Sequence, residues 1–115
     1  MNSKECYCYC LTKLGAIEDY PFGPGIIVIR VAGKIFALLS RWQGQDILSL
    51  KCEPNYSELL RQQYPAVIPG YHLNKRHWNT LLLNGTIPAA ETKGLIDHSY
   101  ELVFSSRGRS KRTGK

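Results

Sequence analysis

Hydrophobic and polar residues alternate along the middle of the chain, whereas near both ends the apolar residues recur at helical spacing. The first such stretch predicts a helix over 3–14. Asn2 or Ser3 can cap its start, and Gly15 can end it. We expect one face of this helix to be buried and to hold Cys6, Tyr7, Cys10, Leu11 and Leu14.

From residue 26 onward the apolar residues become β-branched and then alternate with polar ones, which indicates strands. Three antiparallel strands joined by tight turns are predicted, over 26–32, 35–41 and 47–52. In the last of them Leu48, Leu50 and Cys52 fall on one face, and the polar residues between them fall on the other. The preceding stretch 16–25, AIEDYPFGPG, is rich in proline, glycine and aromatic residues and is interpreted as a stiff structural loop.

Pro54 suits the first turn of a second helix, which we expect to run to Tyr64 and to end before Pro65. Its buried side is expected to hold Leu59, Leu60 and Tyr64. Two short strands are then predicted over 70–73 and 78–83.

A final helix is predicted after Thr86, its candidate cap, with Pro88 in its first turn. Its buried face is expected to hold Ile96, Tyr100, Val103 and Phe104. The element order is therefore α-β-β-β-α-β-β-α. Runs of strands separated by helices indicate the α+β class, as a two-layer sandwich whose antiparallel sheet carries helices on one face. We expect a single domain over 1–106.

The formal charge of +6 is concentrated in the last nine residues, RGRSKRTGK, which carry five basic side chains. The rest of the chain has 10 basic and 9 acidic residues, so it is nearly neutral. The stretch 107–115 has no apolar residue, and we expect it to be a disordered basic tail. Such a tail attracts DNA or another polyanion without specificity, or serves only as a solubilising end.

Cysteine usage and hydropathy bear on metal binding and on cell compartment. The C-x-C-x-C spacing of Cys6, Cys8 and Cys10 lacks the second ligand pair of a zinc site, and on a helix Cys8 points away from the other two. We therefore expect buried structural thiols, no metal and no cofactor. Free thiols suit a reducing compartment. The apolar runs are too short to span a membrane, so we expect a cytoplasmic protein without membrane contact.

The segment 70–80, GYHLNKRHWNT, concentrates the residue types of functional sites. We expect no catalytic residues in it, because His72 and His77 are not spaced to work together and no carboxylate pair accompanies them. Its basic, amide and aromatic side chains suit contact with nucleic acid. The same residues would also suit a turn held by internal hydrogen bonds, and composition and spacing leave both interpretations open.

Several stretches carry a resemblance to a known family: DYPFGP, KIFALLS, QYPAV-PGYH-NKRHWNT and LIDHSYELV. Together they cover most of the chain, which resembles the MmcQ/YjbR family of small bacterial proteins. The resemblance implies a CyaY-like (frataxin-like) and secretion-chaperone-like α/β sandwich. It also implies DNA binding through hairpin wings, and the matching contact residues would be Asn74, Lys75, Arg76, His77, Trp78 and Asn79. The CYCYC stretch and the basic tail do not resemble the family.

Three functions remain as hypotheses. The first is a non-enzymatic DNA-binding protein that uses the basic and aromatic hairpin surface. The second is a protein-interaction adaptor like a secretion chaperone, with a second copy of the chain as one expected partner. The third is a small-ligand-binding protein, whose pocket would require Tyr20, Phe22, Tyr71 and His72 to converge on one cavity.

Overall fold

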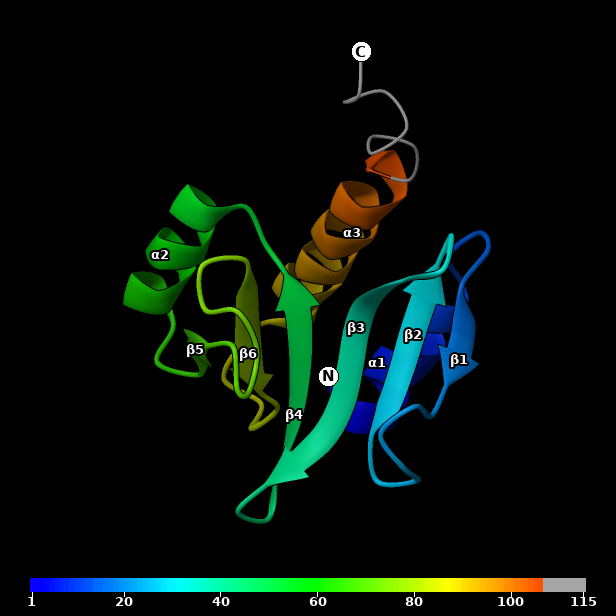
Figure 1. Ribbon diagram of the computed structural model, residues 1–115. Coiled ribbons are helices and arrows are strands. Elements are labelled where there is room, and N and C mark those ends of the chain that lie inside the picture. Colours follow the sequence, from blue (N-terminus) through cyan, green and yellow to red (C-terminus); the bar gives the residue numbers. More distant parts are fainter. Residues whose placement is uncertain (107–115) are drawn as a thin grey trace.

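The computed structural model describes residues 1–106; the predicted basic tail over 107–115 lies outside the described residues. A six-stranded antiparallel sheet forms one layer, with the strand order β1-β2-β3-β4-β6-β5. The helices α1 and α3 lie behind this sheet, and α2 lies at its β5 side (Figure 1). The elements in chain order are α1 Ser3–Leu11, β1 Ile17–Asp19, β2 Ile27–Val31, β3 Lys34–Trp42, β4 Gln45–Lys51, α2 Pro54–Gln63, β5 Val67–Pro69, β6 Trp78–Leu82 and α3 Ala89–Ser105. The predicted α+β class is confirmed, and the eight predicted elements occur in the predicted order, with the short strand β1 added inside the stretch that was predicted to be a loop.

The core lies between the sheet and the helices, as the alternation in β4 predicted. Leu48 and Leu50 are buried on this side together with Phe36 of β3. Phe36 meets the ring of Tyr100 of α3 edge to face, with 5.3 Å between ring centroids. The buried Ser99 hydroxyl of α3 donates to the Phe36 carbonyl at 2.6 Å and accepts from the Lys51 N–H at 2.9 Å. One serine therefore fastens α3 to two neighbouring strands.

Helix α1 starts as predicted but ends earlier. Asn2 is its cap, in a capping box with Glu5. The helix stops at Leu11 and is capped by Thr12, so Leu14 lies beyond it and is 80 % exposed. The prediction that Leu14 is buried was wrong, because the chain turns away from the helical path before it reaches that residue.

Two details around α2 also differ from the predictions. Leu60 is buried, but Leu59 is 62 % exposed, because only one side of this helix meets the sheet. The strand predicted over 70–73 lies instead at Val67–Pro69, where Val67 and Ile68 pair with β6. These two β-branched residues take the pairing positions, and 70–73 begins the turn that follows.

Helix α3 buries Ile96, Tyr100 and Val103 as predicted. Its cap position is Pro88, which offers no side-chain hydrogen bond, and the candidate cap Thr86 is bonded to Asn84 instead. None of the described helices is long and apolar enough to cross a membrane.

Candidate functional site

The helices α1 and α3 leave the other face of the sheet uncovered (Figure 1). A groove of about 700 Å³ lies on that face. Its floor is made by the side chains that alternate with the helix-facing ones in β3 and β4: Leu38, Ser40, Ile47 and Ser49. Its walls are two loops, 22–26 and 71–73, which contribute Phe22, Gly25, Ile26, Tyr71, His72 and Leu73. The groove is therefore apolar, with a few polar groups, and the fold's regular elements hold its floor rigid.

The wall over 71–73 is fastened to the floor by hydrogen bonds. The Tyr71 N–H donates to the Thr80 hydroxyl at 2.9 Å, and that hydroxyl is 2.8 Å from the Ser49 hydroxyl in the floor. His72 follows in a left-handed backbone conformation, with φ of 58°. The Tyr71 ring contacts the rings of His72 and Trp42, with centroid distances of 4.1 and 5.7 Å. This wall is thus a braced array of rings.

The opposite wall carries Phe22, which is 60 % exposed and lies in the loop between β1 and β2. Of the four residues predicted to share a pocket, Phe22, Tyr71 and His72 line this groove. Tyr20 does not line it; its hydroxyl donates to Glu18 at 2.6 Å, toward the edge of the sheet. The floor residues Ser40 and Ser49 were not predicted as site residues.

The groove offers little charge. Arg41 is the one guanidinium among the described residues that line it, and it is paired with Asp46 and donates to the Gly44 carbonyl. No aspartate, glutamate or lysine of residues 1–106 lines it. The Ser40 hydroxyl faces the groove without a hydrogen-bond partner among the side chains described.

The six residues predicted to contact nucleic acid lie in and after the turn that leads to β6. The Asn74 carboxamide oxygen accepts from the N–H groups of Arg76 and His77 at 2.9 and 3.2 Å. The Lys75 ammonium donates to the Gly70 carbonyl at 2.9 Å. These side chains hold the turn closed, as expected if the segment 70–80 is a turn held by internal hydrogen bonds.

Of the remaining predicted contact residues, Asn79 is 2 % exposed and faces the core side of β6. It is therefore not available at the surface. His77 and Trp78 are partly exposed, and Arg76 is exposed.

Arg61 of α2 holds this turn, and sequence reasoning missed it. Its Nε donates to the Asn79 carboxamide oxygen at 2.7 Å, and its terminal nitrogen donates to the carbonyls of Lys75 and Trp78. Arg61, Lys75 and Arg76 also line a crevice of about 290 Å³ beside the start of α2. No pattern in the sequence singles out Arg61, because its partners are distant in the chain.

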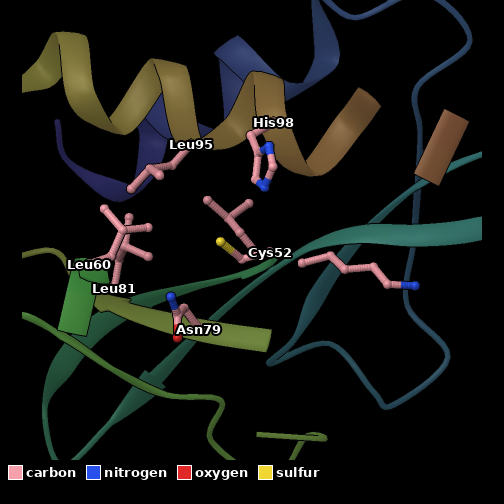
Figure 2. Close-up of a pocket in the computed structure, with 8 residues that line it drawn as sticks. Cys52, Leu60, Asn79, Leu81, Leu95 and His98 are labelled. Carbon is pink, nitrogen blue, oxygen red and sulfur yellow. The ribbon is translucent and has the colours of Figure 1, made fainter. Parts of the chain in front are cut away.

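A second, much smaller cavity lies between the sheet and α3. It has about 10 Å³ of space, room for roughly one water. Figure 2 shows the Asn79 amide nitrogen pointing into it, with Cys52 and His98 on other sides. That nitrogen has no protein partner. Burial raises the pKa of Cys52 and lowers that of His98, so both are neutral near pH 7 and do not form the ion pair of an activated nucleophile.

The N-terminal cysteines behave as the sequence predicted. Cys6 and Cys10 are buried in the core, Cys8 is exposed, and all are free thiols. Burial raises the pKa of Cys6 to about 11 and that of Cys10 to about 12, so both are inert, neutral thiols at pH 7. Within residues 1–106, no three His, Cys, Asp or Glu side chains gather where they could hold a metal ion.

The protein-adaptor hypothesis stays a prediction. Exposed apolar side chains that would serve it lie along the edge strand β1 and its flanks, where Leu14 is 80 % and Ile17 is 67 % exposed.

Comparisons with known proteins agree with this fold. The YjbR family model matches residues 11–102. The YjbR protein of Escherichia coli is 35 % identical over 112 residues, which are 97 % of this chain and 95 % of that protein. The YyaQ protein of Bacillus subtilis is 44 % identical over 117 residues, covering 90 % of this chain and 98 % of the other.

Solved structures of similar proteins have the same fold. The crystal structure of Deinococcus radiodurans protein DR2400 superposes with a TM-score of 0.81 at 37 % identity, covering 87 % of this chain and 76 % of that one. A crystal structure of a Pseudomonas syringae protein superposes with a TM-score of 0.79 at 33 % identity, covering 90 % of this chain and 99 % of that one. With a family model matching most of its length and relatives aligned almost end to end, the chain belongs to the YjbR family.

Proposed function

We propose that the protein is a non-enzymatic binding protein and that a small molecule is its ligand, held in the groove between the loops 22–26 and 71–73. The observation that supports this proposal is the convergence of Phe22, Tyr71 and His72 on one hollow from two segments far apart in the chain. The volume of about 700 Å³ falls within the range of roughly 300–1,000 Å³ that is usual for ligand pockets.

The loop that carries His72 is held in one conformation, which favours a preformed site. The Leu73 N–H donates to the Gly70 carbonyl at 3.4 Å and closes a turn in which His72 is the third residue, with φ of 58°. A positive φ is the usual conformation at that position of a type II turn. The Tyr71 N–H donates to the Thr80 hydroxyl at 2.9 Å and fastens the same turn to β6, so this wall of the groove is in place before a ligand binds.

Two fluorescent probes with one shared ring system test the proposal. N-phenyl-1-naphthylamine is uncharged, and 8-anilinonaphthalene-1-sulfonate adds a sulfonate to the same rings. Both become fluorescent in apolar surroundings. We expect at least one of them to bind the folded chain at a single site, and we expect Ser40→Phe to abolish binding because the new ring fills the floor of the groove.

Phe22→Ala and Leu59→Ala form a matched pair, because Phe22 is 60 % and Leu59 is 62 % exposed but only Phe22 lines the groove. We expect Phe22→Ala to weaken binding about two- to tenfold through the lost ring contact, and Leu59→Ala to leave it unchanged. Circular dichroism would show that each variant is folded. Binding of neither probe, or an equal effect of the two variants, would refute the proposal.

We propose DNA binding as a second candidate, supported by three cations, Arg61, Lys75 and Arg76, which line one crevice together with a single acid, Glu58. Arg76→Glu tests it directly, since this side chain is exposed. Lys4→Glu on α1 is the control with the same change of charge. DNA binding at this crevice predicts that Arg76→Glu weakens duplex binding about tenfold at low salt while Lys4→Glu does not.

A chain that ends at Ser106 separates the tail from the domain in the same titration. If the truncated chain no longer binds DNA and Arg76→Glu has no effect on the full chain, the affinity belongs to residues 107–115. DNA binding by the folded domain would then be excluded.

A further inference from the structure

The groove's electrostatics limit the ligands that it can bind. The Arg41 guanidinium is already paired with Asp46 and bonded to the Gly44 carbonyl, so it is not a free counter-charge. The nearby Ile26, Leu38 and Ile47 are apolar. Among the described residues that line the groove, an anionic ligand would find only the Arg41 guanidinium as a counter-charge, and Asp46 already pairs with it, so the hydration that the ligand loses is poorly replaced. An uncharged ligand avoids that cost.

The walls favour a flat ligand. On one side Phe22 presents an exposed ring, and on the other Tyr71 presents a ring that is in contact with the rings of Trp42 and His72. Aromatic rings pack best against other rings in stacked or edge-on arrangements. Because Tyr71 is braced and tied through its N–H to Thr80, it is positioned before a ligand arrives, which lowers the entropic cost of binding.

The floor adds one polar requirement. Ser40 lies opposite Ile47 in the neighbouring strand and beside Leu38, and its hydroxyl is the floor hydroxyl that has no side-chain partner among the described residues. The Ser49 hydroxyl next to it is already bonded to Thr80. Ser40 can therefore donate to, or accept from, one polar atom of a ligand.

Resting on the proposed function, we infer that the ligand is an uncharged, flat ring compound with one hydrogen-bonding group directed at Ser40. The class includes phenols and hydroxylated or carbonyl-bearing fused rings. Charged ligands, nucleic acid and apolar peptide segments are not the ligands that this groove is built for.

The two probes described above test the charge requirement. We expect N-phenyl-1-naphthylamine to bind about tenfold or more tightly than its sulfonated counterpart, because only the sulfonate must be desolvated without a partner. If the sulfonated probe binds equally well or better, and Ser40→Phe still abolishes its binding, the inference is wrong and the proposed function stands. If neither probe binds, the proposed function itself fails.

A second pair of compounds tests the role of Ser40. We expect 2-naphthol to displace the bound probe at concentrations about two- to tenfold lower than naphthalene, since it alone can bond to the hydroxyl. In Ser40→Ala this difference should vanish while naphthalene binds as before. A difference that persists in Ser40→Ala would overturn the assignment of Ser40.

Sedimentation velocity of the free protein tests whether a second copy of the chain, and not a small ligand, occupies the groove. The inference requires the groove to be open in solution. A dimer that Ser40→Phe converts to a monomer would mean that a second copy of the chain covers this face, and it would overturn the inference.

Discussion

Replacing Arg61 with methionine tests how the turn between β5 and β6 is held. Methionine keeps the aliphatic part of the side chain but removes every hydrogen bond of the guanidinium. In the wild-type protein that group donates to the Asn79 carboxamide oxygen at 2.7 Å and to the carbonyls of Lys75 and Trp78. We expect Arg61→Met to destabilise the protein by about 2–4 kcal/mol.

The magnitude follows from the burial of the acceptors. Asn79 is 2 % exposed, so losing its donor leaves a buried oxygen unsatisfied at a cost of about 1–3 kcal/mol. The carbonyls of Lys75 and Trp78 lie nearer the surface, where water can replace the lost bonds, so each adds only about 0.5 kcal/mol. The cost therefore comes mainly from the pair of Arg61 and Asn79.

A double-mutant cycle with Asn79→Leu isolates that pair. Leucine suits the neighbours of Asn79, which include Leu60, Leu81 and Leu95, and it removes both the buried oxygen and the amide nitrogen that has no partner. In the Asn79→Leu background we expect Arg61→Met to cost only about 1 kcal/mol, because no buried acceptor is left unsatisfied.

Urea unfolding followed by circular dichroism measures the free energy of unfolding of all four proteins. An unchanged slope of this free energy against urea concentration would show that the same unfolding transition is compared. Arg41→Met is the control: its side chain is 63 % exposed, and its removal should change stability by less than about 0.5 kcal/mol. If Arg61→Met costs no more than this control, or costs equally in both backgrounds, the argument that Arg61 anchors the turn through Asn79 is refuted.

Two further predictions concern packing and pH. Gly70→Ala should destabilise by about 1–3 kcal/mol in urea unfolding, because its new Cβ would lie 2.8 Å from that of Trp78, whereas Gly94→Ala in open space on α3 should stabilise by about 0.5–1 kcal/mol. Although partial burial opposes it, the hydrogen bond from Lys13 keeps the pKa of Asp97 below its ordinary value. The ionised carboxylate therefore stabilises the fold above the unfolded-state pKa of about 3.9, and this contribution is lost as the pH falls through the lowered folded-state pKa. Asp97→Asn should cost at most about 1 kcal/mol at pH 7 and less at pH 2, and an equal cost at both values would contradict this.

Local pattern was sufficient for most of the fold. Alternation in β4 correctly placed Leu48 and Leu50 against the helices, and helical spacing correctly separated Cys6 and Cys10 from Cys8. Both predictions depend only on the geometry of a single element.

The wrong predictions concern features that depend on contacts between elements. The exposure of Leu14 and Leu59 is set by where a helix ends and how little of it meets the sheet, and neither is encoded in helical spacing. Strand β5 was misplaced because the turn around residue 72 could not be distinguished from an extended segment by composition.

The candidate site could be predicted only in part. Residue type alone predicted three of the residues that line the groove: Phe22, Tyr71 and His72. Neither the floor residue Ser40 nor the anchor Arg61 could be identified from the sequence. Ser40 acquires its role from the loops 22–26 and 71–73, and Arg61 from Asn79, all of which are separated from them in the sequence.

The most direct test of the central claim is a titration of the ¹⁵N-labelled protein with 2-naphthol, following the amide resonances by NMR. If the groove is the ligand site, the largest shifts will fall on Ser40, on its neighbours in β3 and β4, and on residues 71–73. Saturable shifts confined to α1 and α3 or to residues 74–77, or no saturable shifts at all, would contradict it.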